Sequence, residues 1–132
     1  MTPEISKELQ RIAREYNVHI VFRKWRKGNP GGTWKVNRIT IYCSPDRSRI
    51  WYLSTLFHEL GHQYCYDNGL WKNYHLNVSN IHKIRKIALK AERYVDKHAC
   101  NTLKKYDPAI EYHMFYSKPG ASEFLKNYYK IN

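Results

Sequence analysis

One pentapeptide, His58-Glu59-Leu60-Gly61-His62, constrains this chain more than any other stretch. It lies in a segment, residues 47–66, that the sequence predicts to be a helix. Side chains four residues apart on a helix lie one above the other, with Cβ atoms roughly 5–6 Å apart, so both imidazoles can bind the same metal ion. Glu59 lies about 100° round the helix from His58. Its carboxylate therefore borders the metal, where it can accept a proton from a bound water.

The H-E-x-x-H motif is specific. In a chain of this composition it arises by chance only about 0.02 times, and it is a signature of zinc peptidases. An apolar face accompanies it at helical spacing, formed by Leu53, Leu56, Phe57 and Leu60. The plainer alternative is two surface histidines that happen to flank a glutamate.

A catalytic zinc usually takes three protein ligands and leaves one position for water. The longer motif H-E-x-x-H-x-x-G-x-x-H is excluded, because Cys65 and Asn68 stand at its glycine and third-histidine positions. The third ligand must then come from further along the chain. The candidates are His75, His82, Glu92, Asp96 and His98.

We predict Glu92 as the third ligand. Its neighbours Ala88, Val95 and Ala99 place it on the buried side of a long helix, and a buried carboxylate without a partner is costly. Asp96 follows one turn later on the same face, where it can accept the second ring N–H of a zinc-bound histidine. The alternative is a charged face on which Glu92 and Asp96 pair with nearby Lys and Arg side chains.

The patterns along the whole chain predict a single α+β domain over residues 1–132. We expect a helix over 3–16, a strand over 18–22, a loop over 28–32 and an extended region over 33–42. The metal-site helix follows, then a connector over 70–78 and a second long helix that ends before Asp107-Pro108. An irregular stretch over 112–120 and a closing helix over 122–131 complete the chain. A small, mostly edge-exposed sheet would pack on the H-E-x-x-H helix and the second long helix.

The formal net charge of +12 is large for 132 residues. It indicates attraction to polyanions, so contact with nucleic acid is one reading and a solubilising surface is the other. A basic run with one aromatic, residues 23–27, could hold phosphates and stack a base, although a solvated strand end with a packed Trp25 is favoured. Three cysteines without paired spacing indicate reduced thiols and a cytoplasmic protein. No stretch predicts a membrane span or a signal peptide.

The set His58-Glu59-x-x-His62 with Glu92-x-x-x-Asp96 resembles the gluzincin pattern. Among gluzincins, the small size is most similar to the ImmA/IrrE-like metallopeptidases of bacteria, phages and mobile elements. The resemblance covers residues 39–106. It implies a Zn²⁺ cofactor, a minimal zincin fold, and cleavage of an intracellular protein partner, often a DNA-bound regulator.

The resulting hypothesis is metal-assisted peptide hydrolysis with Glu59 as the general base. An extended substrate could add to the sheet edge along residues 33–42. A donor that stabilises the oxyanion is also expected. Candidates for it are Tyr64, Tyr66, His75, Tyr112, His113 and Tyr116.

Three alternatives stay open. The first is a SprT-like, DNA-associated protease with His75 or His82 as the third ligand. The second is a basic nucleic-acid-binding module whose zinc is structural or absent. The third is an inhibitor or interaction protein on a zincin scaffold, against which the intact Glu59 counts.

Overall fold

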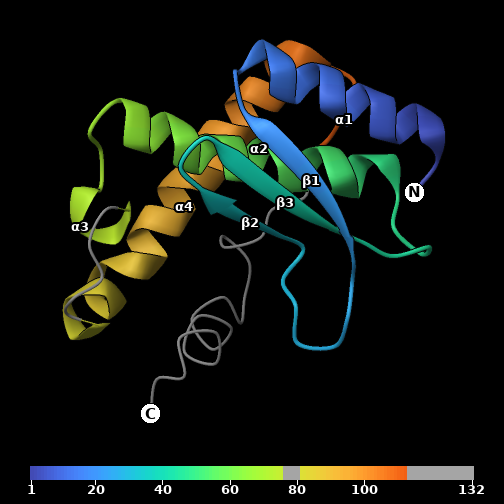
Figure 1. Ribbon diagram of the computed structural model, residues 1–132. Helices are drawn as coiled ribbons and strands as arrows, with labels where there is room; N and C mark the ends of the chain where they lie inside the picture. The colour runs from blue at the N-terminus through green and yellow to red at the C-terminus, as the bar shows by residue number, and fades with distance from the viewer. Residues whose placement is uncertain (76–80, 113–132) are drawn as a thin grey trace.

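The computed structural model describes residues 1–75 and 81–112, without the side chains of residues 73, 75 and 81–86. The predicted closing helix over 122–131 and nearly all of the irregular stretch before it lie outside the described residues. Within them, the elements are α1 (Pro3–Glu15), β1 (His19–Lys24), β2 (Gly32–Lys35), β3 (Arg38–Cys43), α2 (Arg49–Asp67), α3 (Lys72–His75) and α4 (Ile81–Tyr106). The predicted α+β class is confirmed (Figure 1).

The sheet has three strands in the order β1-β3-β2. β1 pairs with β3 in parallel, and β2 pairs with β3 antiparallel. The single extended region expected over 33–42 was wrong in one respect, since it is two strands joined by a tight turn. Asn37 has a φ of 61° at that turn, a conformation that Asn tolerates better than most residues. β2 therefore forms an edge of the sheet.

Helix α1 begins at Pro3, as the sequence predicts, whereas α2 runs from Arg49 to Asp67 instead of the predicted 47–66. Thr2 is the N-cap of α1, with its hydroxyl accepting from the Ile5 amide at 3.3 Å. Ser48 caps α2 in the same way, accepting from the Trp51 amide at 3.2 Å. Such caps satisfy amide groups that the first helical turn leaves without a partner. The expected connector also contains a single helical turn, α3.

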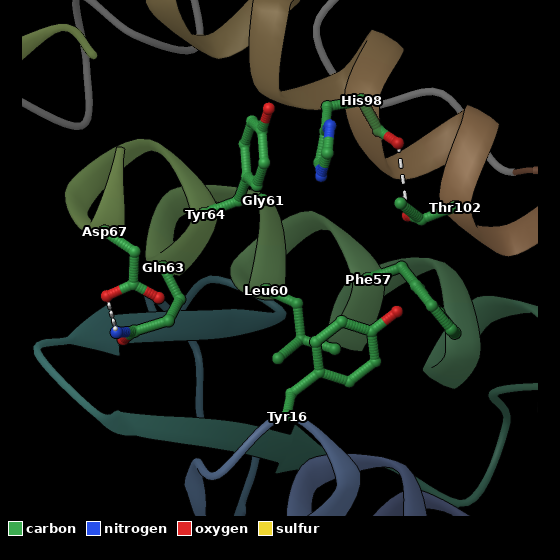
Figure 2. A pocket seen from close by; sticks show the side chains of 9 residues that line it. All are labelled: Tyr16, Phe57, Leu60, Gly61, Gln63, Tyr64, Asp67, His98 and Thr102. Carbon is green, nitrogen blue, oxygen red and sulfur yellow. Dashed lines mark hydrogen bonds between the residues drawn. The ribbon is translucent and has the colours of Figure 1, made fainter. Parts of the chain in front are cut away.

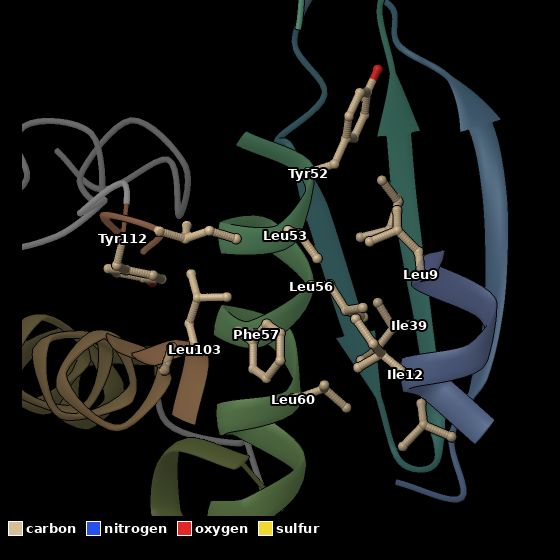
Figure 3. Close-up of a cluster of buried hydrophobic side chains, with 14 residues drawn as sticks. Leu9, Ile12, Ile39, Tyr52, Leu53, Leu56, Phe57, Leu60, Leu103 and Tyr112 are labelled. Atoms are coloured by element: carbon tan, nitrogen blue, oxygen red, sulfur yellow. The ribbon is translucent and has the colours of Figure 1, made fainter. Parts of the chain in front are cut away.

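The hydrophobic core lies on both sides of α2 (Figure 3). Leu9 and Ile12 of α1 and Ile39 of β3 pack on one side, whereas Leu103 and Tyr112 lie on the other. All residues of α2 from 52 to 63 are buried, including its histidines and Glu59. The motif helix is thus the central element of the domain, and its polar groups must find partners inside it.

Helix α4 approaches α2 closely at Gly61. A Cβ built on Gly61 would lie 2.8 Å from Val95 Cγ1 and 3.2 Å from the Val95 carbonyl oxygen. Any side chain larger than hydrogen would push the two helices apart. The glycine between the two motif residues Leu60 and His62 therefore sets how near the carboxylates of α4 come to the histidines of α2.

Among the described helices, none combines the length and the apolar character that crossing a bilayer requires.

A polar clamp joins α1, α2 and α4. Arg49 donates to both carboxylate oxygens of Glu8, at 2.8 and 2.7 Å, and the Tyr106 hydroxyl donates to Glu8 at 2.6 Å. The hydrogen bond from the Arg49 guanidinium lowers the pKa of Glu8. Partial burial opposes this shift, and the hydrogen bond from Tyr106 adds to it.

Because the folded pKa of Glu8 lies below its unfolded value, the clamp stabilises the fold above roughly pH 4.5 and loses this effect as the pH falls further. Between pH 6 and pH 3.5, the wild type should lose more unfolding free energy than Glu8→Gln. The difference should be below about 1 kcal/mol, since the Arg49 side chain is 43% exposed. Urea unfolding of both proteins in chelator measures it, and equal losses would contradict the prediction.

Candidate metal centre

Helices α2 and α4 bring His58, His62 and Glu92 together in the interior. Each offers one ligand atom, and these atoms lie within 4.8 Å of one another. One oxygen of Glu92 is 2.9 Å from His58 Nε2, and the other is 3.3 Å from His62 Nε2. All three residues are buried.

This donor set fits a metal ion. Two imidazole nitrogens and a carboxylate oxygen are the ligands of many catalytic zinc sites, and a tetrahedron with bonds of about 2.0–2.1 Å has ligand atoms about 3.3 Å apart. The histidine nitrogens lie 2.9 and 3.3 Å from different oxygens of Glu92, and the three ligand atoms are all within 4.8 Å of one another. The group could therefore hold a metal ion, with its members paired to one another by ion-pair contacts when none is bound.

Asp96 lies behind His58, on the side away from Glu92. Its Oδ1 is 2.8 Å from His58 Nδ1 and accepts from the Tyr112 hydroxyl at 2.5 Å. Burial would lower the pKa of His58, but the hydrogen bonds with Asp96 and Glu92 outweigh it and raise that pKa to about 10. Burial likewise opposes ionisation of Glu92, yet the two histidines hold its pKa well below the ordinary value. A metal ion would have to displace the proton on His58.

Glu59 differs from the other carboxylates of the centre. It is 7% exposed, and within the described part of the chain no hydrogen bond or ion pair holds its carboxylate. Burial raises its pKa, despite the nearby histidines. A buried carboxylate that lacks a structural partner is costly for stability, and a carboxyl with a raised pKa is suited to proton transfer.

Tyr74 of α3 belongs to the centre, although the sequence did not single it out. Its hydroxyl donates a short hydrogen bond to Glu92 Oε1, and its ring lies 6.1 Å from the His62 ring. The tyrosine thus touches one candidate ligand and flanks another. No spacing signal marks it, because it comes from a separate one-turn helix.

A second set of residues supports His62 from the sheet. The Trp34 indole stacks on the His62 ring, with centroids 6.1 Å apart and planes inclined by 26°. Gln63 Oε1 accepts from Trp34 Nε1 and from the Asn37 amide, each at 2.8 Å. The β2–β3 turn is therefore fixed to the motif helix beside His62. Sequence reasoning also missed these supports.

The other candidates have different outcomes. His98 does not reach the centre, because its ring stacks on Tyr64 at 3.9 Å. Figure 2 shows this pair on the wall of a separate pocket of about 100 Å³. Tyr112 donates to Asp96 instead of facing an open site. Tyr66 packs near Trp34. The side chains of His75, His82, His113 and Tyr116 lie outside the described residues.

No protein-family model, curated protein or solved structure matches the chain significantly.

Asp96 should tune metal binding through His58. Groups that hydrogen-bond a ligand histidine typically contribute about 10–100-fold to metal affinity. We expect Asp96→Asn to weaken Zn²⁺ binding by about that factor, and Tyr112→Phe to weaken it less. Competition with a chromogenic chelator measures both. Unchanged affinity in Asp96→Asn, with an unchanged melting temperature, would contradict this role.

Proposed function

We propose that this protein is a zinc-dependent endopeptidase of the gluzincin type. His58, His62 and Glu92 would hold the zinc ion, and Glu59 would be the general base. The observation that carries the proposal is the buried Glu59 carboxylate, which has no partner in the described chain and lies next to two histidines and a glutamate that can share a metal.

Zinc bound there would supply a Lewis acid that activates water and polarises a peptide carbonyl. Glu59 would accept the proton of the attacking water and return it to the leaving amine. Its raised pKa suits both transfers, because a carboxyl that titrates nearer neutral pH takes up and releases a proton more evenly. Tyr74 would hold Glu92 in position through its hydrogen bond, and Asp96 would fix the orientation of His58.

The edge strand β2 offers a place for an extended substrate. β2 passes so close to α2 that a Cβ built on Gly32 would lie 3.3 Å from Glu59 Cγ. Among the described residues, β2 pairs only with β3, so a peptide that adds to its other edge by main-chain hydrogen bonds would run beside the general base. This favours a protein or peptide substrate over a small molecule.

The contacts of Glu92 favour this arrangement over the SprT-like one, which requires a histidine as the third ligand. They also agree with the resemblance to ImmA/IrrE-like metallopeptidases. On that resemblance we expect a cytoplasmic enzyme whose substrate is a protein partner, with a DNA-bound regulator as the first class to test.

A peptide mixture prepared from a bacterial lysate tests the proposal. Zinc-loaded wild type should produce new peptide termini detectable by mass spectrometry, and chelator should abolish them. Glu59→Gln should keep its zinc but cut at least about 100-fold more slowly, as expected for loss of a general base. Glu111→Gln, at an exposed position, is the matched control and should cut normally. Equal cutting by Glu59→Gln and wild type would refute the assigned base.

A further inference from the structure

The segment between β3 and α2 contains an arginine that no carboxylate of the described residues holds in an ion pair. Arg47, just before the N-cap of α2, lies over the Trp51 ring at 3.8 Å and near the Trp25 ring at 5.5 Å. Within the described residues it makes no hydrogen bond or ion pair, and its Nη1 atom is fully buried without a partner. Of the guanidinium nitrogens only Nη1 is so enclosed, so Nε and Nη2 are left to meet a ligand.

Two tryptophans hold this guanidinium in place. Stacking on aromatic faces orients the planar group and keeps its donors aimed in one direction. The neighbouring carboxylate, Asp46, is exposed and accepts from the Ser44 hydroxyl, which lowers its pKa; the charge of Arg47 adds to this shift, but no hydrogen bond or ion pair joins the two side chains. An arginine that is oriented but unpaired is suited to bind an anion that the protein itself does not supply.

A rigid turn brings more positive charge to the same place. The Trp25 indole donates to the Asn29 carbonyl at 2.9 Å, and Asn29 Oδ1 accepts from the Arg26 amide at 3.1 Å. These bonds close a turn whose exposed tip carries Arg26 and Lys27. Trp25 thus joins the turn to Arg47.

The turn lies directly upstream of the proposed substrate strand. A Cβ built on Gly31 would be 3.6 Å from Arg47 Nη1, and the next residue, Gly32, approaches Glu59. Along α2, Glu59 lies eight positions after Trp51, which corresponds to a rise of about 12 Å. An extended peptide covers this distance in about three or four residues.

We propose that Arg47, with Arg26 and Lys27, forms an anion subsite that selects an acidic side chain three or four residues from the scissile bond. The inference rests on the proposed function only in so far as it takes that bond to be the one that is cleaved. The site itself is a place where a carboxylate on an extended peptide binds. Its narrow position beside one strand favours a peptide side chain over the broad backbone contact that nucleic acid requires.

Binding of short labelled probes tests the subsite without any need for catalysis. All proteins would carry Glu59→Gln and zinc, and fluorescence anisotropy would follow a blocked hexaglutamate, a blocked hexaglutamine and a hexathymidylate. Near 0.15 M salt, attraction by the overall charge is screened beyond about 8 Å. Arg14→Gln is the matched control, because Arg14 is exposed and lies at the end of α1 that leads into the start of β1, whereas the turn follows the other end of that strand.

We expect hexaglutamate to bind about tenfold more tightly than hexaglutamine, the size of one charge-assisted hydrogen-bonded contact. Arg47→Gln should remove this difference, and Arg14→Gln should change it less than about twofold. Equal losses in the two variants would overturn the proposal in favour of a net-charge effect. Hexathymidylate binding that exceeds hexaglutamate binding and depends on Arg47 would overturn it in favour of phosphate recognition.

A second variant covers the case in which Arg47→Gln does not fold. Arg26→Gln with Lys27→Gln changes exposed side chains only and should weaken hexaglutamate binding several-fold, whereas no change would overturn the proposal. The outcomes also separate the two proposals. Selective binding of hexaglutamate through Arg47 without any peptide cleavage by wild type would refute the peptidase and keep the subsite. Peptide cleavage that is unchanged by Arg47→Gln would keep the peptidase and refute the subsite.

Discussion

Four titratable side chains are buried where α2 crosses α4, and the rest of the structure depends on how they satisfy one another. His58 lies between Glu92 and Asp96, and Glu92 also reaches His62. Removing one member would leave a buried charge without a partner, which typically costs several kcal/mol. Such a cluster is rarely the most stable way to fill a core. Its retention at the centre of a small domain is more easily understood as a binding site than as a structural device.

The crossing itself is set by packing. Gly61 lets the backbone of α2 approach Val95, so that Glu92 and Asp96, on either side of Val95 along α4, both reach His58. The sheet then covers the opposite side of the motif helix, with Gly32 of β2 against Glu59. The result is one carboxylate, Glu59, without a hydrogen bond or ion pair among the described residues, and two that are held by His58 and His62. This difference follows from geometry alone, since all three carboxylates are buried.

The elements that could be predicted from sequence are those with a local signal. The helical apolar spacing defines α1 and α2 within the sequence itself, although α2 begins at Arg49, two residues after the predicted start. The turn at Asn37 was not predicted. It contains no glycine, and the residues on both sides of it have the composition of one uninterrupted strand. The contributions of Tyr74 and Gln63 could not be predicted either. They come from separate elements that meet only after folding, so no spacing along the chain records them.

Glu92 was predicted because its apolar neighbours at helical spacing fix a buried face, and burial of a carboxylate demands a partner. The same reasoning left His98 as a candidate, although it faces Tyr64 instead of the centre. Helical periodicity assigns a residue to a face of its own helix. It does not say which neighbour that face meets.

Metal content measured by mass spectrometry of purified protein tests the central claim most directly. The comparison is between wild type, Glu92→Ala and Glu111→Ala, each supplied with Zn²⁺ and then dialysed. We predict one zinc per chain in wild type and in Glu111→Ala, and none in Glu92→Ala when it is still folded. Zinc retained tightly by folded Glu92→Ala would contradict the assignment of the third ligand. Absence of zinc from the wild type would contradict the metal centre itself.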